Sequence, residues 1–584
     1  MTQPIQYSLS ISNVNAHLAE VAVHVPSPAA GALSVAMPSW TPGSYLMREF
    51  ARHVQQFGAV DQTGERLAWR KTARGVWEIS VPEGTAEVVV TYTLYAHDLS
   101  PRCNHVTDEH AFFNGASAFM FVMGAEGRSC TLDIECPFPD WKIYTALPNQ
   151  EGTTFPLCTG RFVATDYDHF IDCPILLGAH EVLAFPAAGT THRFVFAGEA
   201  PVPTEQLALD IPPLVQATAD LFDGDIPYDS YLHIVLHTES MRGGLEHRNS
   251  AALLFPRNHW VAEHGYEDFL ALVSHEHFHA WNVKRIRPQV LGPFDYLNEG
   301  YTRALWVMEG VTCYYESVLL LRAGLVTEER FLELLAKRIA DLRQIPGRRL
   351  HSLEDASFDA WIKLYRRDES SDNTSVSYYL KGEVVACLLD LHIRAVTDGA
   401  KSLDDMMKRL WARYRAEGTG YPEEAFQGWL EDIAGASLDA FFDKFVRGTE
   451  EPDYDEHLAP FGLRLEAVDH DPDKAYLGIS TREIGDALMA VDKIRRGSPA
   501  EAAGVYPADQ IVALDGLKLD RKTQDGLLRR YRPGSESELH VFRRGKLVSV
   551  KVRFGSPPVD KYAIVAAESP SAEAESARRR WLGI

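Results

Sequence analysis

The spacing of apolar residues divides the chain into a β half followed by a helical half. Over residues 1–170, segments such as "AEVAVHV", "GVWEISV" and "AEVVVTYTLYAH" alternate or cluster β-branched and aromatic residues between Gly, Pro and Asp. This pattern is typical of strands. No convincing helical pattern interrupts it, so we predict a β-sandwich-like N-terminal domain over residues 1–170. Residues 171–265 mix strand patterns ("THRFVFAG", "YLHIVLHT") with one helix around "PPLVQATADLFDG".

From about residue 267 to 448 the apolar residues recur at helical spacing, as in "FLELLAKRIADL", "EVVACLLDLHIRAV" and "LDDMMKRLWARYRAE". A β part that leads into a helical part predicts an α+β domain over residues 171–455. After the acidic, turn-rich "RGTEEPDYDEHLAPFG", residues 465–556 are expected to form short strands and two short helices. Residues 557–584 are expected to be a C-terminal tail. Its low-complexity "ESPSAEAESA" predicts flexibility, while Trp581 and Leu582 at its end are candidates for docking onto the body.

Length and charge restrict the classes of function. A chain of 584 residues predicts three or four domains. With 58 basic against 81 acidic residues the net charge is −23, which disfavours nucleic acid as a partner. No apolar run reaches the roughly 18 residues of a membrane span, and "MTQPIQYSLSISN" lacks the features of a secretory signal. The seven cysteines follow no pattern, so we expect free thiols and a cytoplasmic protein without membrane partners.

The stretch "SHEHFHAWNVKRIRP" at residues 274–288 carries the strongest chemical signal. On a helix His275 and His279 share one face, with Glu276 beside them. This is the HExxH arrangement, in which two imidazoles bind zinc and the carboxylate holds the attacking water. His277 lies about 200° round the helix from His275 and is not expected in the same site. The apolar residues of "FLALVSHEHFHAW" indicate that the helix is buried.

A zinc peptidase needs a third protein ligand and one open position for water. Two glutamates are candidates. Glu299 lies in "FDYLNEGYTR" among polar neighbours, and Glu309 lies in "ALWVMEGVTCYYE" among apolar ones. Because a carboxylate in apolar surroundings must be neutralised, and a metal ion does so well, we expect Glu309 to be the ligand. Glu299 is kept as the alternative.

Together these residues resemble a known family. The combination of "HEHFHAWNVKRIRP", "LGPFDY" and "YTRALWVMEGVTCYY" is similar to the bacterial glycyl aminopeptidase family of zinc peptidases, and "PSWTPGSYLMREFARHV" at residues 38–54 resembles that family's N-terminal signature. The resemblance implies a thermolysin-like catalytic domain that holds one Zn²⁺ per chain. It also implies removal of one residue from a free amino terminus, with a preference for Gly or Ala. The family's "EGxTxYY" context supports Glu309, whereas the "NEG" of more distant aminopeptidase N-like relatives keeps Glu299 open.

The segment "RGGLEHRNS" at residues 242–250 stands where those relatives have Gly-x-Met-Glu-Asn. It departs from that motif at Leu245 and His247. Gly243 and Gly244 would let backbone groups approach a substrate closely. Glu246 would pair with the substrate's ammonium group.

"SVSYYLKGEVVACLLDL" is similar to the relatives' Tyr-x-Lys-Gly segment, which supplies a phenol to the oxyanion. The pattern selects Tyr379, with Tyr378 as the alternative. Near the C-terminus, "GSPAEAAGV" and "DQIVALDG" resemble a bacterial PDZ domain. Its "YLGI" loop at residues 476–479 would receive a peptide carboxylate, and the neighbouring strand edge would add a peptide strand.

These features predict a zinc aminopeptidase in which Glu276 transfers the proton of the attacking water to the leaving amine. Its partners would be peptides with a free N-terminus and a C-terminal peptide or strand in the PDZ groove. Two alternatives stay open: a zinc endopeptidase that recruits substrates through the PDZ domain, and a catalytically silent PDZ-bearing binding protein.

Overall fold

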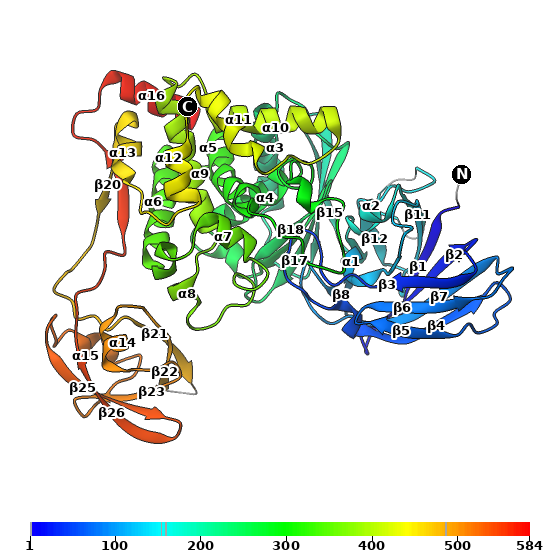
Figure 1. The fold of residues 1–584 in the computed structure, drawn as a ribbon, viewed down its shortest axis with the longest axis horizontal. Coiled ribbons are helices and arrows are strands. Elements are labelled where there is room, and N and C mark those ends of the chain that lie inside the picture. The colour runs from blue at the N-terminus through cyan, green and yellow to red at the C-terminus, as the bar shows by residue number, and fades with distance from the viewer. Residues whose placement is uncertain (1–2, 153–154, 158–159, 485–487) are drawn as a thin grey trace. The chain divides into compact units, whose positions relative to one another are not determined.

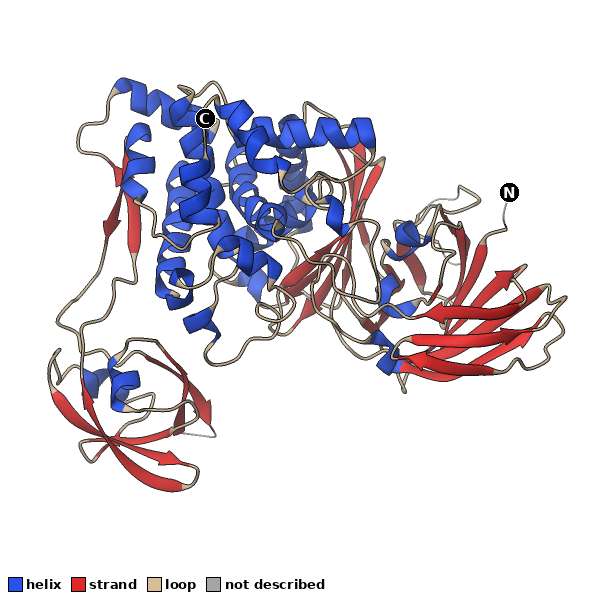
Figure 2. Ribbon diagram, in the orientation of Figure 1, coloured by secondary structure: helices blue, strands red, loops and turns tan. Residues whose placement is uncertain are grey.

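The computed structural model describes residues 3–152, 155–157, 160–484 and 488–584 (Figures 1 and 2). The N-terminal part is built of strands with only short helices, as the alternating pattern predicts. A six-stranded sheet has the order β13-β11-β1-β2-β7-β4, and a four-stranded sheet has the order β10-β3-β6-β5. The strands of these two sheets are β1 (Ile5–Asn13), β2 (Leu18–Pro26), β3 (Gly31–Ala36), β4 (Val54–Asp61), β5 (Trp69–Ala73), β6 (Val76–Val81), β7 (Glu87–Tyr95), β10 (Phe121–Val122), β11 (Cys130–Glu135) and β13 (Gly160–Ala164).

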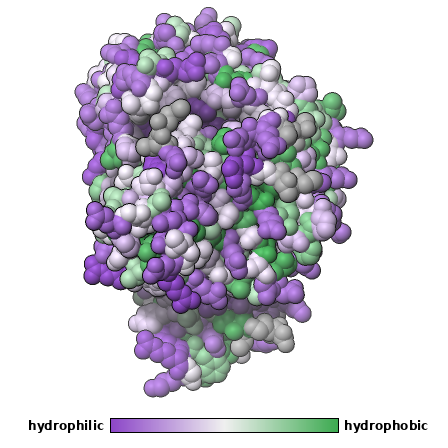
Figure 3. Space-filling model, turned by 90° about the vertical axis from the view of Figure 1, so that its right-hand side faces the viewer, coloured by the Kyte–Doolittle hydropathy of each residue, from purple (hydrophilic) through white to green (hydrophobic). Residues whose placement is uncertain are grey.

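Alternation along β2 illustrates why these segments are strands. Ala19, Val21, Val23 and Val25 are buried, whereas Glu20, between Ala19 and Val21, is exposed. Successive side chains of a strand point to opposite faces, so such a segment has one face in the core and one in solvent. Hydrophilic side chains cover most of the face drawn in Figure 3, with hydrophobic ones in scattered patches.

A third N-terminal sheet has the order β12-β14-β9-β8, and nearly all its residues are buried, so it is covered on both faces. Its strands are β8 (Asn104–Val106), β9 (His110–Phe113), β12 (Lys142–Thr145) and β14 (Ile175–Gly178). Phe113 packs into the N-terminal core, while the preceding Phe112 packs with residues of the next sheet. The continuous apolar runs of β9 and β14 are typical of a sheet covered on both sides. Because β14 belongs to this sheet, the β-rich part continues past the expected boundary at residue 170.

A five-stranded sheet follows, with the order β15-β16-β17-β19-β18; it lies in the expected catalytic domain and is called the catalytic sheet below. Its strands are β15 (Val182–Ala187), β16 (Thr190–Ala197), β17 (Ser230–Thr238), β18 (Gly243–Glu246) and β19 (Ser250–Pro256). β18 is the edge strand and pairs antiparallel with β19. The helix α4 (Gly265–Phe278) packs on β18 and β19, and α3 (Thr204–Leu221) packs on α4. The HExxH segment thus lies at the C-terminal end of a buried helix beside a sheet edge.

In the helical part, the backbones of two helical segments pack closely against each other. The π-helical turn η4 (Trp306–Gly310) continues into α5 (Val311–Arg322) and packs against α9 (Leu380–Val396). A Cβ on Gly310 would lie 2.5 Å from the Cα of Gly382, so both glycines are needed for the approach. The other helices of eight or more residues here are α6 (Glu328–Gln344), α10 (Leu403–Glu417) and α11 (Ala425–Ala434).

The C-terminal region contains a sheet of order β21-β22-β23-β25-β26, with β24 on β23. Its elements are β21 (Ile479–Ile484), β22 (Leu488–Ile494), α14 (Pro499–Ala503), β23 (Gln510–Leu514), β24 (Leu517–Lys518), α15 (Gln524–Leu528), β25 (Glu536–Arg543) and β26 (Lys546–Arg553). Separately, β20 (Leu463–Ala467) pairs with β27 (Tyr562–Ala566). The short strands and two short helices agree with the sequence analysis.

The expectation of a flexible tail was wrong. Residues Ala572–Leu582 form the helix α16, capped by Ser571, whose side chain accepts a hydrogen bond from the backbone N–H of Ala574. Trp581 is buried, and its Nε1 donates to the hydroxyl of Tyr314 at 2.8 Å. The composition of the tail is low in complexity, but Ala, Glu and Arg are strong helix formers, and a buried tryptophan anchors the helix. Among the described helices, none is long and apolar enough to cross a membrane.

Candidate metal centre and substrate site

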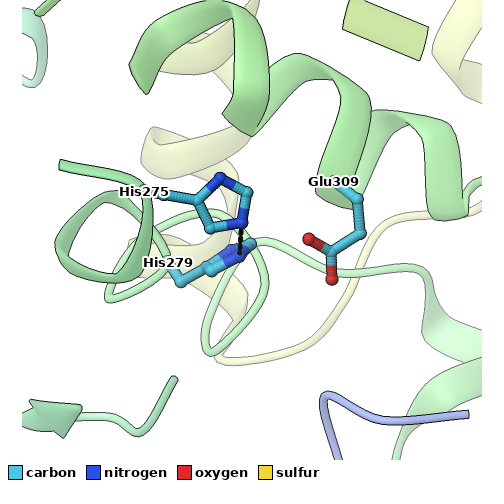
Figure 4. Close-up of side chains that lie close together, drawn as sticks. All are labelled: His275, His279 and Glu309. Atoms are coloured by element: carbon cyan, nitrogen blue, oxygen red, sulfur yellow. Dashed lines mark hydrogen bonds between the residues drawn. The ribbon is translucent and has the colours of Figure 1, made fainter. Parts of the chain in front are cut away.

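The helix α4 brings the two imidazoles of the HExxH segment together, with their ring planes nearly perpendicular. The Nε2 atoms of His275 and His279 lie 3.0 Å apart (Figure 4). Each Nδ1 faces an oxygen: Glu316 Oε2 at 3.1 Å for His275 and the carbonyl of Asn282 at 2.6 Å for His279. When each Nδ1 donates to its oxygen, both Nε2 atoms carry lone pairs that point at each other. A cation between them turns this repulsion into coordination, so the residues present fit a metal ion.

A carboxylate completes the donor set. Glu309 is on η4 and is 2% exposed. Its oxygen and the ring nitrogens of His275 and His279 all lie within 4.8 Å of one another, and Figure 4 shows the carboxylate pointing toward the imidazoles. Glu299, the alternative from the sequence, is exposed in a loop. Two imidazoles and a carboxylate are a donor set that suits zinc.

His277 is directed to another part of the structure. It is 1% exposed, and its Nε2 lies 2.5 Å from the hydroxyl of Tyr228. Its ring also packs edge-on against Tyr231 and Trp281. The residue therefore anchors the back of α4, while His275 and His279 face the metal centre.

The edge strand β18 lies against the carboxylate of Glu276. Glu276 is 5% exposed. A Cβ built on Gly244 would lie 2.7 Å from Glu276 Cγ and closer still to Oε1, whereas a Cβ on Gly243 would meet nothing within 4 Å. Of the two positions, only 244 therefore requires glycine, because only there does the strand lie close to Glu276. Its missing side chain leaves the space that the Glu276 carboxylate occupies.

Glu246, at the end of β18, is a buried acid directed into the same site. It is 4% exposed, and its Oε1 has no hydrogen-bond partner among the described residues. One of its oxygens lies within 4.8 Å of both a Glu276 oxygen and a His279 nitrogen. A buried carboxylate without a partner is costly, and a cationic group of a ligand would neutralise it.

Of the two tyrosines proposed for the oxyanion, Tyr379 is half-buried and Tyr378 fully buried. The hydroxyl of Tyr379 lies 3.4 Å from that of Tyr365. Burial, together with the negative charge of Glu309, raises the pKa of Tyr379 well above its usual value. The phenol therefore stays protonated at neutral pH and can donate a hydrogen bond.

Several residues near the site were missed by sequence reasoning. Glu316, which orients His275, follows Glu309 by two helical turns, and that spacing was a usable signal. Arg102 donates to the carbonyl of Gly244 at 2.9 Å, and Gly43 packs against Glu246. No local pattern reveals the last two, because both come from the N-terminal β region and reach the site only through the tertiary fold.

Comparisons with known proteins match three family models along the chain. Residues 6–179 match the model of the Peptidase M61 N-terminal domain, residues 268–385 that of M61 glycyl aminopeptidase, and residues 475–554 that of a PDZ domain. An aminopeptidase N family protein from Idiomarina loihiensis of known structure is 28% identical, with a TM-score of 0.93 over 99% of this chain and 100% of that chain. An M1 zinc metallopeptidase from Deinococcus radiodurans is 15% identical, with a TM-score of 0.49 over 77% of this chain and 94% of that one.

A curated protein from Hahella chejuensis, described as a probable periplasmic serine endoprotease DegP-like, is 32% identical over 105 residues. That match spans 16% of this chain and only 22% of the relative, so nothing about that protein's activity transfers. The predicted multidomain fold, the PDZ domain and the aminopeptidase class are confirmed by the family models and the Idiomarina structure. The chain belongs to the M61 glycyl aminopeptidase family of metallopeptidases.

Proposed function

We propose that the protein is a zinc-dependent aminopeptidase that removes a first Gly or Ala from peptides with a free amino terminus. The observation that carries this proposal is the buried, unpartnered carboxylate of Glu246 within 4.8 Å of Glu276 and His279. A free amino terminus is cationic near neutral pH and pairs with such a carboxylate. The preference for a small first residue rests on the description of the family.

His275, His279 and Glu309 would hold one zinc ion per chain. When bound, the ion supplies a Lewis acid that polarises the scissile carbonyl and lowers the pKa of a water. Glu316 and the carbonyl of Asn282 hold the two imidazoles in the tautomer that presents Nε2 to a metal. Such supporting contacts fix the orientation of metal ligands.

The remaining roles belong to protein groups. The Glu276 carboxylate accepts a proton from the attacking water and delivers it to the nitrogen of the leaving amine. The Tyr379 hydroxyl donates a hydrogen bond to the oxygen of the scissile carbonyl as negative charge develops there. Gly244 lets the edge strand run close to the base, so that a substrate backbone on β18 lies beside the proton acceptor.

The PDZ domain offers a second peptide site. β21 is the edge strand of its sheet, and the "YLGI" segment at residues 476–479 ends at its first residue, Ile479. Gly478 has a φ of 78°, and a Cβ there would meet the side chain of Ser498. We propose that the loop binds a peptide carboxylate through its backbone N–H groups, with the peptide added as a strand along β21.

The test compares glycine 4-nitroanilide with its N-acetylated form on the metal-loaded enzyme. We expect cleavage of the free amine, at least 100-fold slower cleavage of the acetylated form, loss of activity with 1,10-phenanthroline and recovery when zinc is added back. The leucine anilide measures the preference for small residues. Equal cleavage of the free and acetylated substrates would favour an endopeptidase, and no turnover by zinc-loaded protein would favour a binding protein.

A further inference from the structure

A turn of the N-terminal β region meets the carboxylate of Glu246. A Cβ built on Gly43 would lie 2.7 Å from the Cδ of Glu246 and closer still to Oε1. Gly43 also has a φ of 88°, in the left-handed region that favours glycine. Its backbone therefore covers one side of the acid that we assign to the substrate's amino terminus.

The turn is held firmly in this position. Trp40 Nε1 donates to the carbonyl of Asp295 at 2.8 Å, and the backbone N–H of Ser39 donates to the carbonyl of Tyr296 at 2.7 Å. Within the turn, the N–H of Ser44 donates to the carbonyl of Thr41 at 3.1 Å. Both residues that close the turn are buried, so the turn behaves as a fixed wall.

The position of the N-terminal region relative to the edge strand is fixed by further contacts. Arg102 binds the carbonyl of Gly244, as described above. Asp172 forms an ion pair with Lys284 at 2.6 Å and contacts His247 at 3.1 Å, one residue beyond Glu246. Phe112 belongs to the core of the catalytic sheet. The turn and the edge strand are therefore parts of one packed structure.

We infer that residues 41–44 form the wall that restricts this site to free amino termini, with Gly43 as a positioning residue for Glu246. This inference rests on the proposed function. The Glu246 carboxylate contacts the turn at Gly43, and one of its oxygens lies within 4.8 Å of Glu276 and His279. On this inference the substrate's ammonium group binds beside the Glu246 carboxylate and the turn leaves no room for an acyl group or a preceding residue, so the substrate class is peptides whose first residue is unmodified. The N-terminal region thus supplies the exopeptidase specificity, while the catalytic domain supplies the chemistry.

The test introduces one methyl group against the carboxylate. Gly43→Ala should raise KM for glycine 4-nitroanilide at least tenfold, with zinc content unchanged. Gly64→Ala is the matched control, because Gly64 has a φ of 85° and nothing within 4 Å of its Cβ position. Backbone strain is therefore similar in both variants, and only the first one crowds Glu246. The control should keep the kinetics of the wild type.

A double-mutant cycle separates positioning from general damage. Glu246→Asp withdraws the carboxylate by one methylene, so the added methyl group of Gly43→Ala no longer crowds it. The KM increase of the double variant should therefore be at least threefold smaller than the product of the two single increases. With Gly64→Ala the effects should multiply. A wild-type KM in Gly43→Ala, or effects that multiply in the cycle, would overturn the inference even if wild-type enzyme rejects the acetylated substrate. Should Gly43→Ala not fold, Trp40→Phe tests the wall by loosening its anchor: discrimination against the acetylated substrate should fall at least threefold, and unchanged discrimination would refute it.

Discussion

Replacing Gly244 with alanine tests whether the close approach of β18 to the base is needed for catalysis. The backbone of Gly244 has an ordinary φ, so alanine fits the strand without strain. Its methyl group, however, would lie 2.7 Å from Glu276 Cγ and closer to Oε1, where ordinary contacts are 3.4–4 Å. Either the carboxylate or the strand must retreat by about 1 Å or more, and a displacement of about 1 Å can lower the rate roughly 10²-fold.

We therefore expect Gly244→Ala to lower kcat on glycine 4-nitroanilide by about 10²-fold. Zinc content should change little, since no metal ligand is touched. Gly243→Ala is the control, because it adds the same methyl group one residue earlier in the same strand, with nothing within 4 Å. The assay is steady-state kinetics on both variants, with metal analysis of the same preparations. Wild-type kcat in Gly244→Ala, or an equal loss in Gly243→Ala, would refute the reasoning.

Three further predictions concern the metal, the oxyanion and pH. Glu309→Ala should lose zinc by metal analysis while Glu299→Ala retains it; the reverse result would reassign the third ligand. Tyr379→Phe should lower kcat by about 10²–10³, the scale of one oxyanion donor, and Tyr378→Phe should lower it far less. Burial opposes ionisation of Asp172, but its lysine and histidine partners hold the pKa below the usual 3.8. The stabilisation is therefore complete above pH 3.8 and is lost as pH falls below it, so Asp172→Asn should cost about 3–5 kcal/mol near neutral pH, with a smaller difference in acid, by denaturant unfolding.

The periodicity of the sequence is enough to find the elements that carry the chemistry. A spacing of four residues places His275 and His279 on one helical face wherever the helix lies, because the geometry of a helix is local. The same reasoning correctly sends His277 to the opposite face. Alternation in β2 and continuous apolar runs in β9 and β14 likewise follow from local rules for exposed and buried sheets.

Prediction from local sequence failed where the composition of a segment indicated flexibility but its tertiary packing made it ordered. The tail looked flexible because its composition is simple, yet α16 forms and Trp581 is buried. Isolated helices of this length are marginal in water, so tertiary burial of the tryptophan decides that the helix is present. A sequence pattern reports a helix-forming tendency but not the partner that stabilises it.

The sequence by itself determined the family, the order of the domains and the candidate residues for metal and base. Only the tertiary structure placed Glu309 rather than Glu299 within 4.8 Å of the imidazoles, and only it brought Gly43 against Glu246. The physical reason is the separation along the chain over which a sequence pattern carries information. Helix and strand periods relate residues a few positions apart, whereas Gly43 and Glu246 meet through the packing of the N-terminal region against the catalytic sheet. Such contacts depend on shapes that the fold creates, and no spacing along the chain encodes them.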